Sequence, residues 1–278
     1  MGPLEGMRLL SLAVNVPGPV AAARLHQLGV AVVKVEPPAG DPLARHSPEW
    51  YAALCAGQQV QRLDLKDPAQ RADLDRLLQG CDLFLTSSRP AALAGLGLDW
   101  ASLHARHPRL AQVAIIGFPP PHQNVPGHDL TYLAAHGLLL PPRLPPTLLA
   151  DLAGAERAVS AALGLLLARE RGADAGYAEV ALAEVAESFA APLRHGLTAP
   201  SGLLGGGWPG YNLYAAGRGW VAVAALEPHF WARLQRELGL DGATYDDLAA
   251  ILATRAAEEW ESWAAERDLP ITALRHQA

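Results

Sequence analysis

Short apolar runs alternate with helix-forming segments along the first part of the chain, and this alternation limits the folds that are open to it. The apolar run at 8–13 is followed by a helical pattern at 19–28, and a second apolar run begins at 31. Two strand-length runs separated by a helix are typical of a βαβ unit, whose strands are parallel. Further helices and strands are expected at 67–78, 82–85, 98–106 and 110–116. The pattern predicts an α/β domain with a doubly wound, mostly parallel sheet.

A change in composition near residue 195 divides the chain. The following stretch contains three consecutive glycines, which is typical of a linker or loop. Beyond it, two short strands flank a glycine-containing turn and two helices follow, which indicates a small α+β domain built on a hairpin. We therefore expect a Rossmann-like large domain at 1–195, a glycine-rich linker at 196–207 and a small α+β domain at 208–278.

Composition and charge narrow the function classes. The formal net charge is -6 and no run of lysine or arginine occurs, so nucleic acid and anionic membrane are not expected partners. No uninterrupted apolar stretch reaches the roughly 18 residues of a membrane-spanning helix. Cys55 and Cys81 form neither a disulfide framework nor a metal cluster, so we expect a cytoplasmic protein without a bound metal. Only 18% of the residues are charged, which favours an oligomer that buries part of its surface.

An imidazole and a carboxylate stand at two predicted helix starts. His128 begins a helix expected at 127–139, and Asp151 begins an Ala/Leu-rich helix expected at 151–169. The simplest interpretation is structural, with Asp129 and Asp151 each capping the helix that it begins. The functional interpretation is that His128 and Asp151 act as base and acid, because these groups can move a proton to or from carbon.

Two further charged residues have both a structural and a functional interpretation. Glu227 precedes Pro228, a residue favoured at the first position of a helix, so it could act as a helix cap. If Glu227 instead contacts His128, it would fix the tautomer of the imidazole and raise its basicity. Arg89 follows a strand and could hold a phosphate group bidentately, or it could be a solvated loop residue. The turn at 15–19 lacks the glycine spacing of a dinucleotide-binding fingerprint, so no NAD site is expected.

Many short motifs occur in the order known from one protein family. They are the segments 4–12, 18–19, 28–38, 40–42, 63–66 and 89–90, and the segments around Gly127-His128-Asp129, Asp151 and Glu227. Through them the chain resembles the class III CoA-transferase family (CaiB/BaiF type) from about residue 4 to about residue 240, and most closely its α-methylacyl-CoA racemase branch. The resemblance implies the fold of that family and an enzyme that acts on acyl-CoA thioesters.

The resemblance also implies roles for individual residues. In the racemase branch, Asp151 and His128 would serve opposite faces of the α-carbon, and Glu227 would support His128. In the transferases, the carboxylate at the position of Asp151 is instead the nucleophile. Backbone amides at the helix start near Asp151 could hold the enolate oxygen. The candidates for holding the CoA phosphates are Arg24, Lys34, Arg45 and Arg89. Coenzyme A would enter as part of the substrate, and no permanently bound cofactor is expected.

Two departures from the family accompany this resemblance. The segment 55–59 reads Cys-Ala-Gly-Gln-Gln where the family usually has basic residues that help to hold the CoA phosphates. The chain also stops at Ala278, whereas relatives return to the large domain and close an interlocked dimer ring, so we expect a C-terminally short homologue. A homodimer is expected, with its interlocking left open.

Three functions are consistent with these observations. We favour racemisation or epimerisation of a 2-substituted acyl-CoA by His128 and Asp151. The second is transfer of CoA between an acyl-CoA and a carboxylate through Asp151. The third is CoA binding without turnover.

Overall fold

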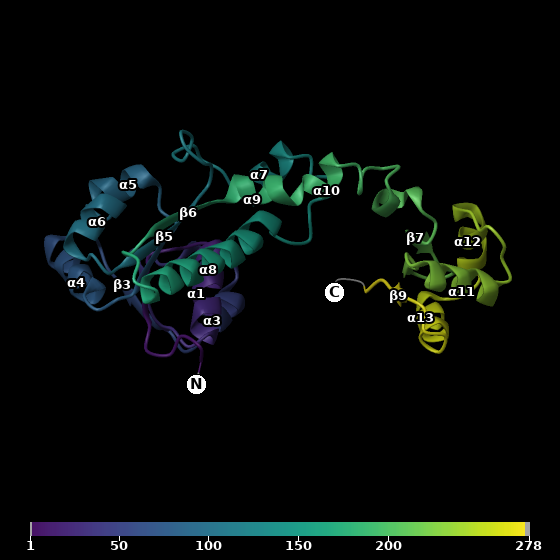
Figure 1. Ribbon diagram of the computed structural model, residues 1–278, viewed down its shortest axis with the longest axis horizontal. Coiled ribbons are helices and arrows are strands. Elements are labelled where there is room, and N and C mark those ends of the chain that lie inside the picture. The colour runs from purple at the N-terminus through teal and green to yellow at the C-terminus, as the bar shows by residue number, and fades with distance from the viewer. Residues whose placement is uncertain (1, 276–278) are drawn as a thin grey trace. The chain divides into compact units, whose positions relative to one another are not determined.

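A computed structural model describes residues 2–275 of the chain (Figure 1). Contacts divide the chain into two compact units, Met1–Phe189 (unit 1) and Ala190–Ala278 (unit 2), each with its own sheet and core. The division falls slightly before the expected boundary at 195, because α9 (Leu182–Phe189) packs against helices of unit 1. Within the expected linker, residues Leu203–Gly207 form one short turn, η1, in which Gly205 and Gly206 have non-helical backbone angles.

Unit 1 is built on a six-stranded parallel sheet in the order β3-β2-β1-β4-β5-β6. The strands are β1 (Arg8–Ser11), β2 (Ala31–Glu36), β3 (Gln59–Arg62), β4 (Leu83–Thr86), β5 (Ala111–Ile116) and β6 (Tyr177–Ala181). This confirms the expected doubly wound α/β domain. The strand order reverses between β1 and β4, and the chain diverges there to opposite faces of the sheet, which opens a crevice at the carboxyl ends of these two strands.

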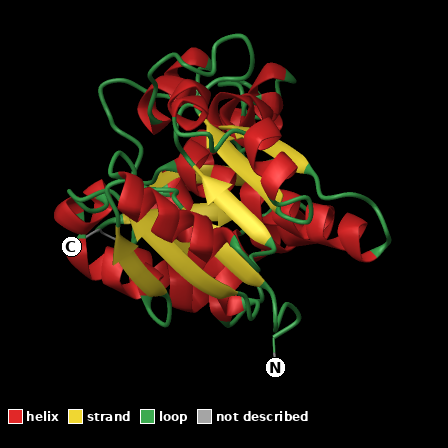
Figure 2. Ribbon diagram, turned by 90° about the vertical axis from the view of Figure 1, so that its left-hand side faces the viewer, coloured by secondary structure: helices red, strands yellow, loops and turns green. Residues whose placement is uncertain are grey.

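Helices cover both faces of the sheet (Figure 2). Alternate residues of the central strands point to opposite sides, so Leu9 and Leu83 belong to one core while Leu10 and Phe84 belong to the other. The first core includes α1 (Pro17–Gln27), α7 (Asp129–Ala135), α8 (Leu149–Glu170) and α9. The second includes α4 (Pro68–Leu78), α5 (Pro90–Gly95) and α6 (Trp100–Arg106). The short helices α2 (Pro42–His46) and α3 (Pro48–Cys55) precede β3.

Several helix boundaries differ from those expected, and two of them lie beside the site. α8 begins at Leu149, two residues before the expected start at Asp151. α7 ends at Ala135 rather than near residue 139, because Gly137 adopts a left-handed backbone with φ 72°. Both boundaries bear on the site described below, since α7 and α8 carry its central residues.

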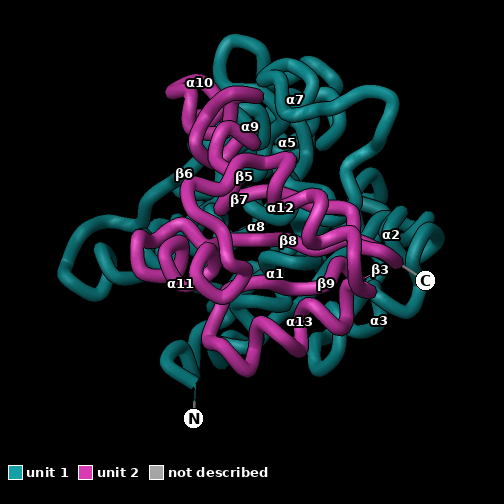
Figure 3. The backbone as a smooth tube through the Cα atoms, turned by 90° about the vertical axis from the view of Figure 1, so that its right-hand side faces the viewer, with its two compact units in different colours: residues 1–189 teal, residues 190–278 magenta. Residues whose placement is uncertain are grey.

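Unit 2 contains a three-stranded antiparallel sheet in the order β7-β8-β9 (magenta in Figure 3). The strands are β7 (Tyr211–Ala215), β8 (Trp220–Ala224) and β9 (Ile271–Ala273), and the helices of this unit are α10 (Ala191–Arg194), α11 (Pro228–Leu238), α12 (Tyr245–Leu252) and α13 (Ala257–Ala265). The core is formed around the buried side chains of Tyr214 and Trp260. The expected small α+β domain, including its hairpin, is confirmed, but the second of its two expected helices is divided into α12 and α13.

Two properties of the described part of the chain bear on membranes and metals. Its helices include none with the length and apolarity needed to span a membrane. Across residues 2–275, no three His, Cys, Asp or Glu side chains are grouped so that they could hold a metal ion.

Candidate active site

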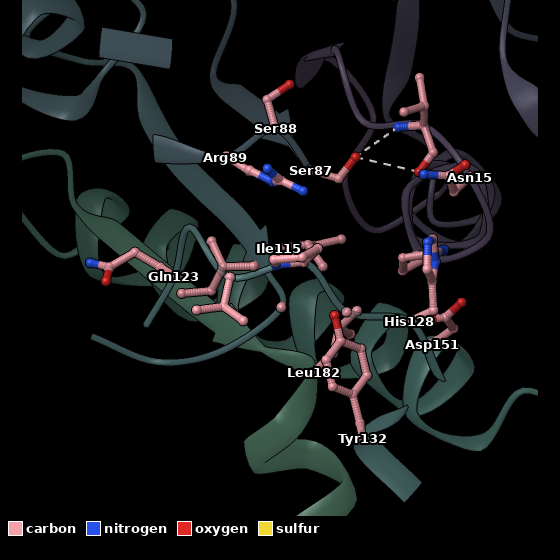
Figure 4. Close-up of a pocket in the computed structure, with 17 residues that line it drawn as sticks. Asn15, Ser87, Ser88, Arg89, Ile115, Gln123, His128, Tyr132, Asp151 and Leu182 are labelled. Carbon is pink, nitrogen blue, oxygen red and sulfur yellow. Dashed lines mark hydrogen bonds between the residues drawn. The ribbon is translucent and has the colours of Figure 1, made fainter. Parts of the chain in front are cut away.

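A cavity of about 220 Å³ opens at the carboxyl ends of β1, β4 and β5, where the strand order reverses (Figure 4). Its polar lining comes from the turns that follow β1 and β4, from the loop that follows β5, and from α7 and α8: Asn15, Ser87, Ser88, Arg89, Gln123, His128, Tyr132 and Asp151. The structure therefore brings together three of the side chains proposed from the sequence, namely Arg89, His128 and Asp151.

Asp151 is the third residue of α8, and not its N-cap as expected, because the helix begins at Leu149. Burial, followed by repulsion from the nearby Asp129 carboxylate, raises the pKa of Asp151 from its ordinary value of 3.8 to about 7. A carboxyl group with this pKa is present in both protonation states near neutral pH. Asp151 can therefore both accept and donate a proton.

The capping role belongs to Asp129, which is only 5% exposed. Its Oδ1 accepts hydrogen bonds from the backbone N–H groups of Ala150 (2.7 Å) and Asp151 (3.0 Å). Asp129 thus caps α8, and the expectation that it caps its own helix was wrong. Because a backbone N–H has a single hydrogen, these two amides are engaged, which argues against the expectation that amides near Asp151 hold an enolate oxygen.

His128 is the N-cap residue of α7. Its backbone N–H donates to Thr131 Oγ1 (3.0 Å), and Thr131 Oγ1 donates in turn to the His128 carbonyl oxygen (2.7 Å). These reciprocal bonds fix the backbone at the start of the helix. The imidazole lines the same cavity as Asp151, and Figure 4 shows both side chains on the side of the cavity where Asn15 lies.

The turns after β1 and β4 are joined to each other at the rim of the cavity. Ser87 Oγ accepts the Val14 N–H (2.9 Å) and donates to the Val14 carbonyl oxygen (3.3 Å), as the dashed lines in Figure 4 mark. Asn15 adopts a left-handed backbone with φ 66°, and its N–H donates to Asp41 Oδ1 (3.0 Å). The turn expected at 15–19 is a strand-to-helix turn, which is a favoured ligand position, but no role was proposed for Asn15 itself, and Ser87 and Tyr132 were not proposed for the site. The available signal was that Asn15 and Ser87 closely follow predicted strands.

Among the four basic residues proposed to hold CoA phosphates, Arg89 alone lines this cavity. Lys34 is fully buried, with its Nζ 3.0 Å from Glu36 Oε1 and 2.8 Å from Asp41 Oδ2. Its ammonium group therefore balances two buried carboxylates inside unit 1 and is not presented to a ligand, so we no longer propose Lys34 for phosphate binding.

The other proposed residues lie elsewhere. Arg24 Nε pairs with Glu156 Oε1 at 2.8 Å on the exposed surface of α1 and α8. Arg45 is exposed in the short helix α2. Glu227 is the N-cap residue of α11 in unit 2, where its side chain makes no capping hydrogen bond. Its predicted contact with His128 of unit 1 stays a prediction.

A second and larger cavity of about 820 Å³ adjoins the first, and Val14 and Ser88 line both. Most of its walls are aliphatic side chains and prolines from the ends of β1 and β2, the segment after β3, and α5. Lys66, which the sequence analysis did not propose, contributes an exposed ammonium group to it.

Comparison with known proteins agrees with this geometry. A family model described as CoA-transferase family III matches residues 4–278. The α-methylacyl-CoA racemase of Homo sapiens is 32% identical over 257 residues, which cover 85% of this chain and 65% of the human protein. The succinyl-CoA–D-citramalate CoA-transferase of Chloroflexus aurantiacus is 31% identical over 192 residues, 64% of this chain and 48% of that protein. The chain therefore spans about half to two thirds of the length of these curated relatives.

A solved structure supports the same relationship. The crystal structure of the hypothetical protein Rv3272 from Mycobacterium tuberculosis superposes with a TM-score of 0.87 at 26% identity, covering 100% of this chain and 85% of that one.

Proposed function

The chain belongs to CoA-transferase family III, and on that premise we propose that it catalyses α-proton transfer on a 2-substituted acyl-CoA, by racemisation or epimerisation. The observation that carries the proposal is that His128 and Asp151 line one cavity. The similarity to a human protein named α-methylacyl-CoA racemase gives it further support.

Inversion at an α-carbon needs a base on one face of the carbon and an acid on the other. The thioester carbonyl makes the α-proton acidic, because the electron pair of the C–H bond can be delocalised onto oxygen as an enolate. His128 would remove the proton in one direction while protonated Asp151 returns one to the opposite face, and the roles exchange in the other direction. The Asp151 pKa of about 7 suits this exchange, since neither of its protonation states is rare at neutral pH.

The two adjoining cavities provide room for an elongated substrate. We place the acyl thioester in the smaller cavity beside His128 and Asp151, and the nucleotide end of coenzyme A in the larger one. Lys66 in the larger cavity would then meet the phosphates, as would Arg89, which directly follows Ser88 where the two cavities adjoin. Coenzyme A enters and leaves as part of the substrate, without a resident cofactor.

Transfer of CoA between an acyl-CoA and a free carboxylate is the second candidate. The observation that favours it is the partly desolvated Asp151 carboxyl in the cavity, which in its ionised form could attack the thioester carbon and release CoA thiolate. The similarity to a Chloroflexus protein named as a CoA-transferase supports this route. It has no need of an imidazole at position 128.

One experiment distinguishes α-proton transfer from CoA transfer. The purified protein is incubated with a 2-methylacyl-CoA in D₂O, and the α-proton is followed by proton NMR. We expect the α-proton signal to disappear with the wild-type protein and to persist with His128→Ala and Asp151→Asn. His46→Ala, an exposed histidine of α2 outside both cavities, serves as the matched control and should exchange normally.

The remaining outcomes decide between the alternatives. Absence of exchange, together with CoA transfer that survives His128→Ala and is lost in Asp151→Asn, would contradict racemisation and establish transfer. Absence of both activities in a protein that binds CoA by calorimetry would support the third function, CoA binding without turnover.

We also propose a homodimer in which Glu227 orients His128. The proposal is supported by the resemblance described above and by the apolar side chains that unit 1 leaves exposed, such as Leu140 (82%) and Leu144 (75%). Light scattering measures the mass of the assembly, and a monomer at micromolar concentration contradicts the proposal. Glu227→Gln should slow α-proton exchange without changing that mass.

A further inference from the structure

Tyr132 presents a hydroxyl group to the catalytic cavity. The residue is only 2% exposed, yet it lines the cavity together with His128 and Asp151. Figure 4 shows its hydroxyl end directed toward the middle of the cavity. Within residues 2–275 the hydroxyl has no hydrogen-bond partner. The hydroxyl group opens onto the cavity and no described residue occupies it, so it is free to pair with a group that enters the cavity.

Two glycines fix the position of this ring. A Cβ atom added to Gly117 would lie 2.6 Å from Tyr132 Oη, and one added to Gly127 would lie 2.5 Å from Cε1 and 2.8 Å from Oη. The Phe118 ring packs edge-on at a centroid distance of 5.2 Å and an interplanar angle of 78°. The phenol is therefore held by backbone on two sides and by an aromatic ring, so its hydroxyl group keeps one place in the cavity.

The charges around the phenol keep it protonated. Burial and the nearby Asp151 carboxylate raise the pKa of Tyr132 to about 12, partly offset by the Arg89 guanidinium. At neutral pH the hydroxyl group therefore donates a hydrogen bond and does not act as a base.

The backbone donors closest to Asp151 are already engaged. The N–H groups of Ala150 and Asp151 donate to Asp129 Oδ1, and that of Leu152 donates to the Leu148 carbonyl oxygen at 3.0 Å. Both candidate reactions build negative charge on the thioester oxygen, which needs a donor already aimed at it. The Tyr132 hydroxyl is a donor beside Asp151 that no other described residue uses.

We propose that the Tyr132 hydroxyl donates a hydrogen bond to the thioester carbonyl oxygen and stabilises the negative charge that develops on it. The inference rests on the proposed function for the presence of an acyl-CoA in this cavity. In α-proton transfer, His128 or Asp151 takes the proton, the C–H electron pair becomes the C=C bond of the enolate, and the carbonyl π pair moves to oxygen. The pairs return on reprotonation, and Tyr132 keeps its own proton throughout. In CoA transfer, the same oxygen carries the charge of the tetrahedral adduct with Asp151.

The kinetic test compares Tyr132→Phe with Tyr177→Phe. Tyr177 lies in β6 outside the cavity, where its hydroxyl group donates to Glu179 Oε1 (2.6 Å). For Tyr132→Phe we expect kcat of α-proton exchange to fall about 100-fold while KM changes no more than roughly threefold, as when one oxyanion donor is removed. Fluorinated tyrosines at position 132 should change kcat in step with phenol acidity, which a packing role would not produce. An unchanged kcat overturns the inference and leaves the proposed function standing.

A binding test does not depend on which reaction occurs. Calorimetry compares 2-methylpropanoyl-CoA with the thioether S-(2-methylpropyl)-CoA, which lacks the carbonyl oxygen. Tyr132→Phe should weaken binding of the thioester roughly 2- to 3-fold and leave binding of the thioether unchanged. Equal losses for both ligands, or no loss for either, overturn the inference. Failure of the proposed function is recognised separately, because the wild-type protein would then exchange no α-proton.

Discussion

The buried carboxylate of Asp129 accepts the backbone N–H of Asp151 at 3.0 Å, across 22 positions of sequence. Asp129 directly follows His128, so this bond and the one from Ala150 tie the segment that bears the imidazole to the helix that bears the carboxyl group. The charge of Asp129 also contributes to the raised pKa of Asp151. Asp129 therefore influences both the position and the protonation of Asp151.

Asp129→Asn separates these two effects. The amide oxygen can still accept the N–H groups of Ala150 and Asp151, but the negative charge is gone, so the pKa of Asp151 should fall below its present value of about 7. His128, Tyr132 and Arg89, which line the same cavity, remain in place. Where Asp151 acts as base, the rate of α-proton exchange falls as pH decreases through that pKa. The acidic limb of the profile of kcat/KM against pH should therefore move to lower pH, and an unmoved limb would contradict a role for the Asp129 charge.

Asp151→Asn should make the fold more stable at alkaline pH. The pKa of this carboxyl is raised from 3.8 to about 7 in the folded state, so its favourable contribution is complete below pH 3.8 and is lost as pH rises through 7. A shift of this size corresponds to at most about 4 kcal/mol, and partial exposure of the side chain reduces this to the order of 2 kcal/mol.

Urea unfolding at two pH values checks this prediction. The stability gained by Asp151→Asn over the wild-type protein should be clear at pH 8 and small at pH 4. An equal gain at both values would mean that ionisation of Asp151 is not its cause.

Gly127→Ala should disturb the position of Tyr132. The added Cβ would meet Tyr132 Cε1 at 2.5 Å and Phe118 Cε2 at 2.9 Å, and both rings are packed too closely to move away freely. We expect the free energy of unfolding to fall by about 1–3 kcal/mol and kcat of exchange to fall about tenfold.

Gly164→Ala is the matched control for this substitution. Gly164 is exposed within α8, and outside its chain neighbours and the backbone of the same helix no heavy atom lies within 4 Å of the Cβ position. Its replacement should raise stability by about 0.5–1 kcal/mol through helix propensity and leave activity unchanged. If Gly127→Ala and Gly164→Ala have equal effects on stability and kcat, a clash with the Tyr132 ring is not the cause of the effect.

Lys34→Ala and Lys66→Ala should have opposite consequences. Removal of the buried Lys34 ammonium leaves Asp41 without a counterion and Glu36 with only the exposed Arg62 guanidinium at 3.9 Å, at a cost of about 3–5 kcal/mol. Lys66 is exposed at the larger cavity, so its removal should change stability by no more than about 0.5 kcal/mol. It should weaken CoA binding roughly fivefold, as expected for the loss of one phosphate contact. Denaturant unfolding checks the two stability predictions, and calorimetric titration with CoA checks the binding prediction. Weaker CoA binding by a Lys34→Ala protein that remains stable would overturn the structural role assigned to Lys34.

The parallel sheet could be predicted because buried strands and the helices between them leave patterns within a few residues. β3 was missed, since Gln59–Arg62 forms a largely exposed edge strand with three polar residues among its four and therefore has no apolar run. The start of α8 was misplaced because Asp151 looked like an N-cap, whereas the capping carboxylate comes from Asp129.

The sequence by itself determined the α/β framework and the types of reactive group at positions 128 and 151, because strand and helix patterns and short motifs are local. Only the tertiary structure decided which side chains the cavity receives. The sequence predicted that Lys34 could bind a CoA phosphate, but in the folded protein its ammonium group pairs with Glu36 and Asp41 in the interior. Tyr132 lies in the core, yet it directs its hydroxyl group into the cavity beside Gly117 and Gly127. Burial and pKa depend on neighbours that are remote along the chain, and no local pattern records them.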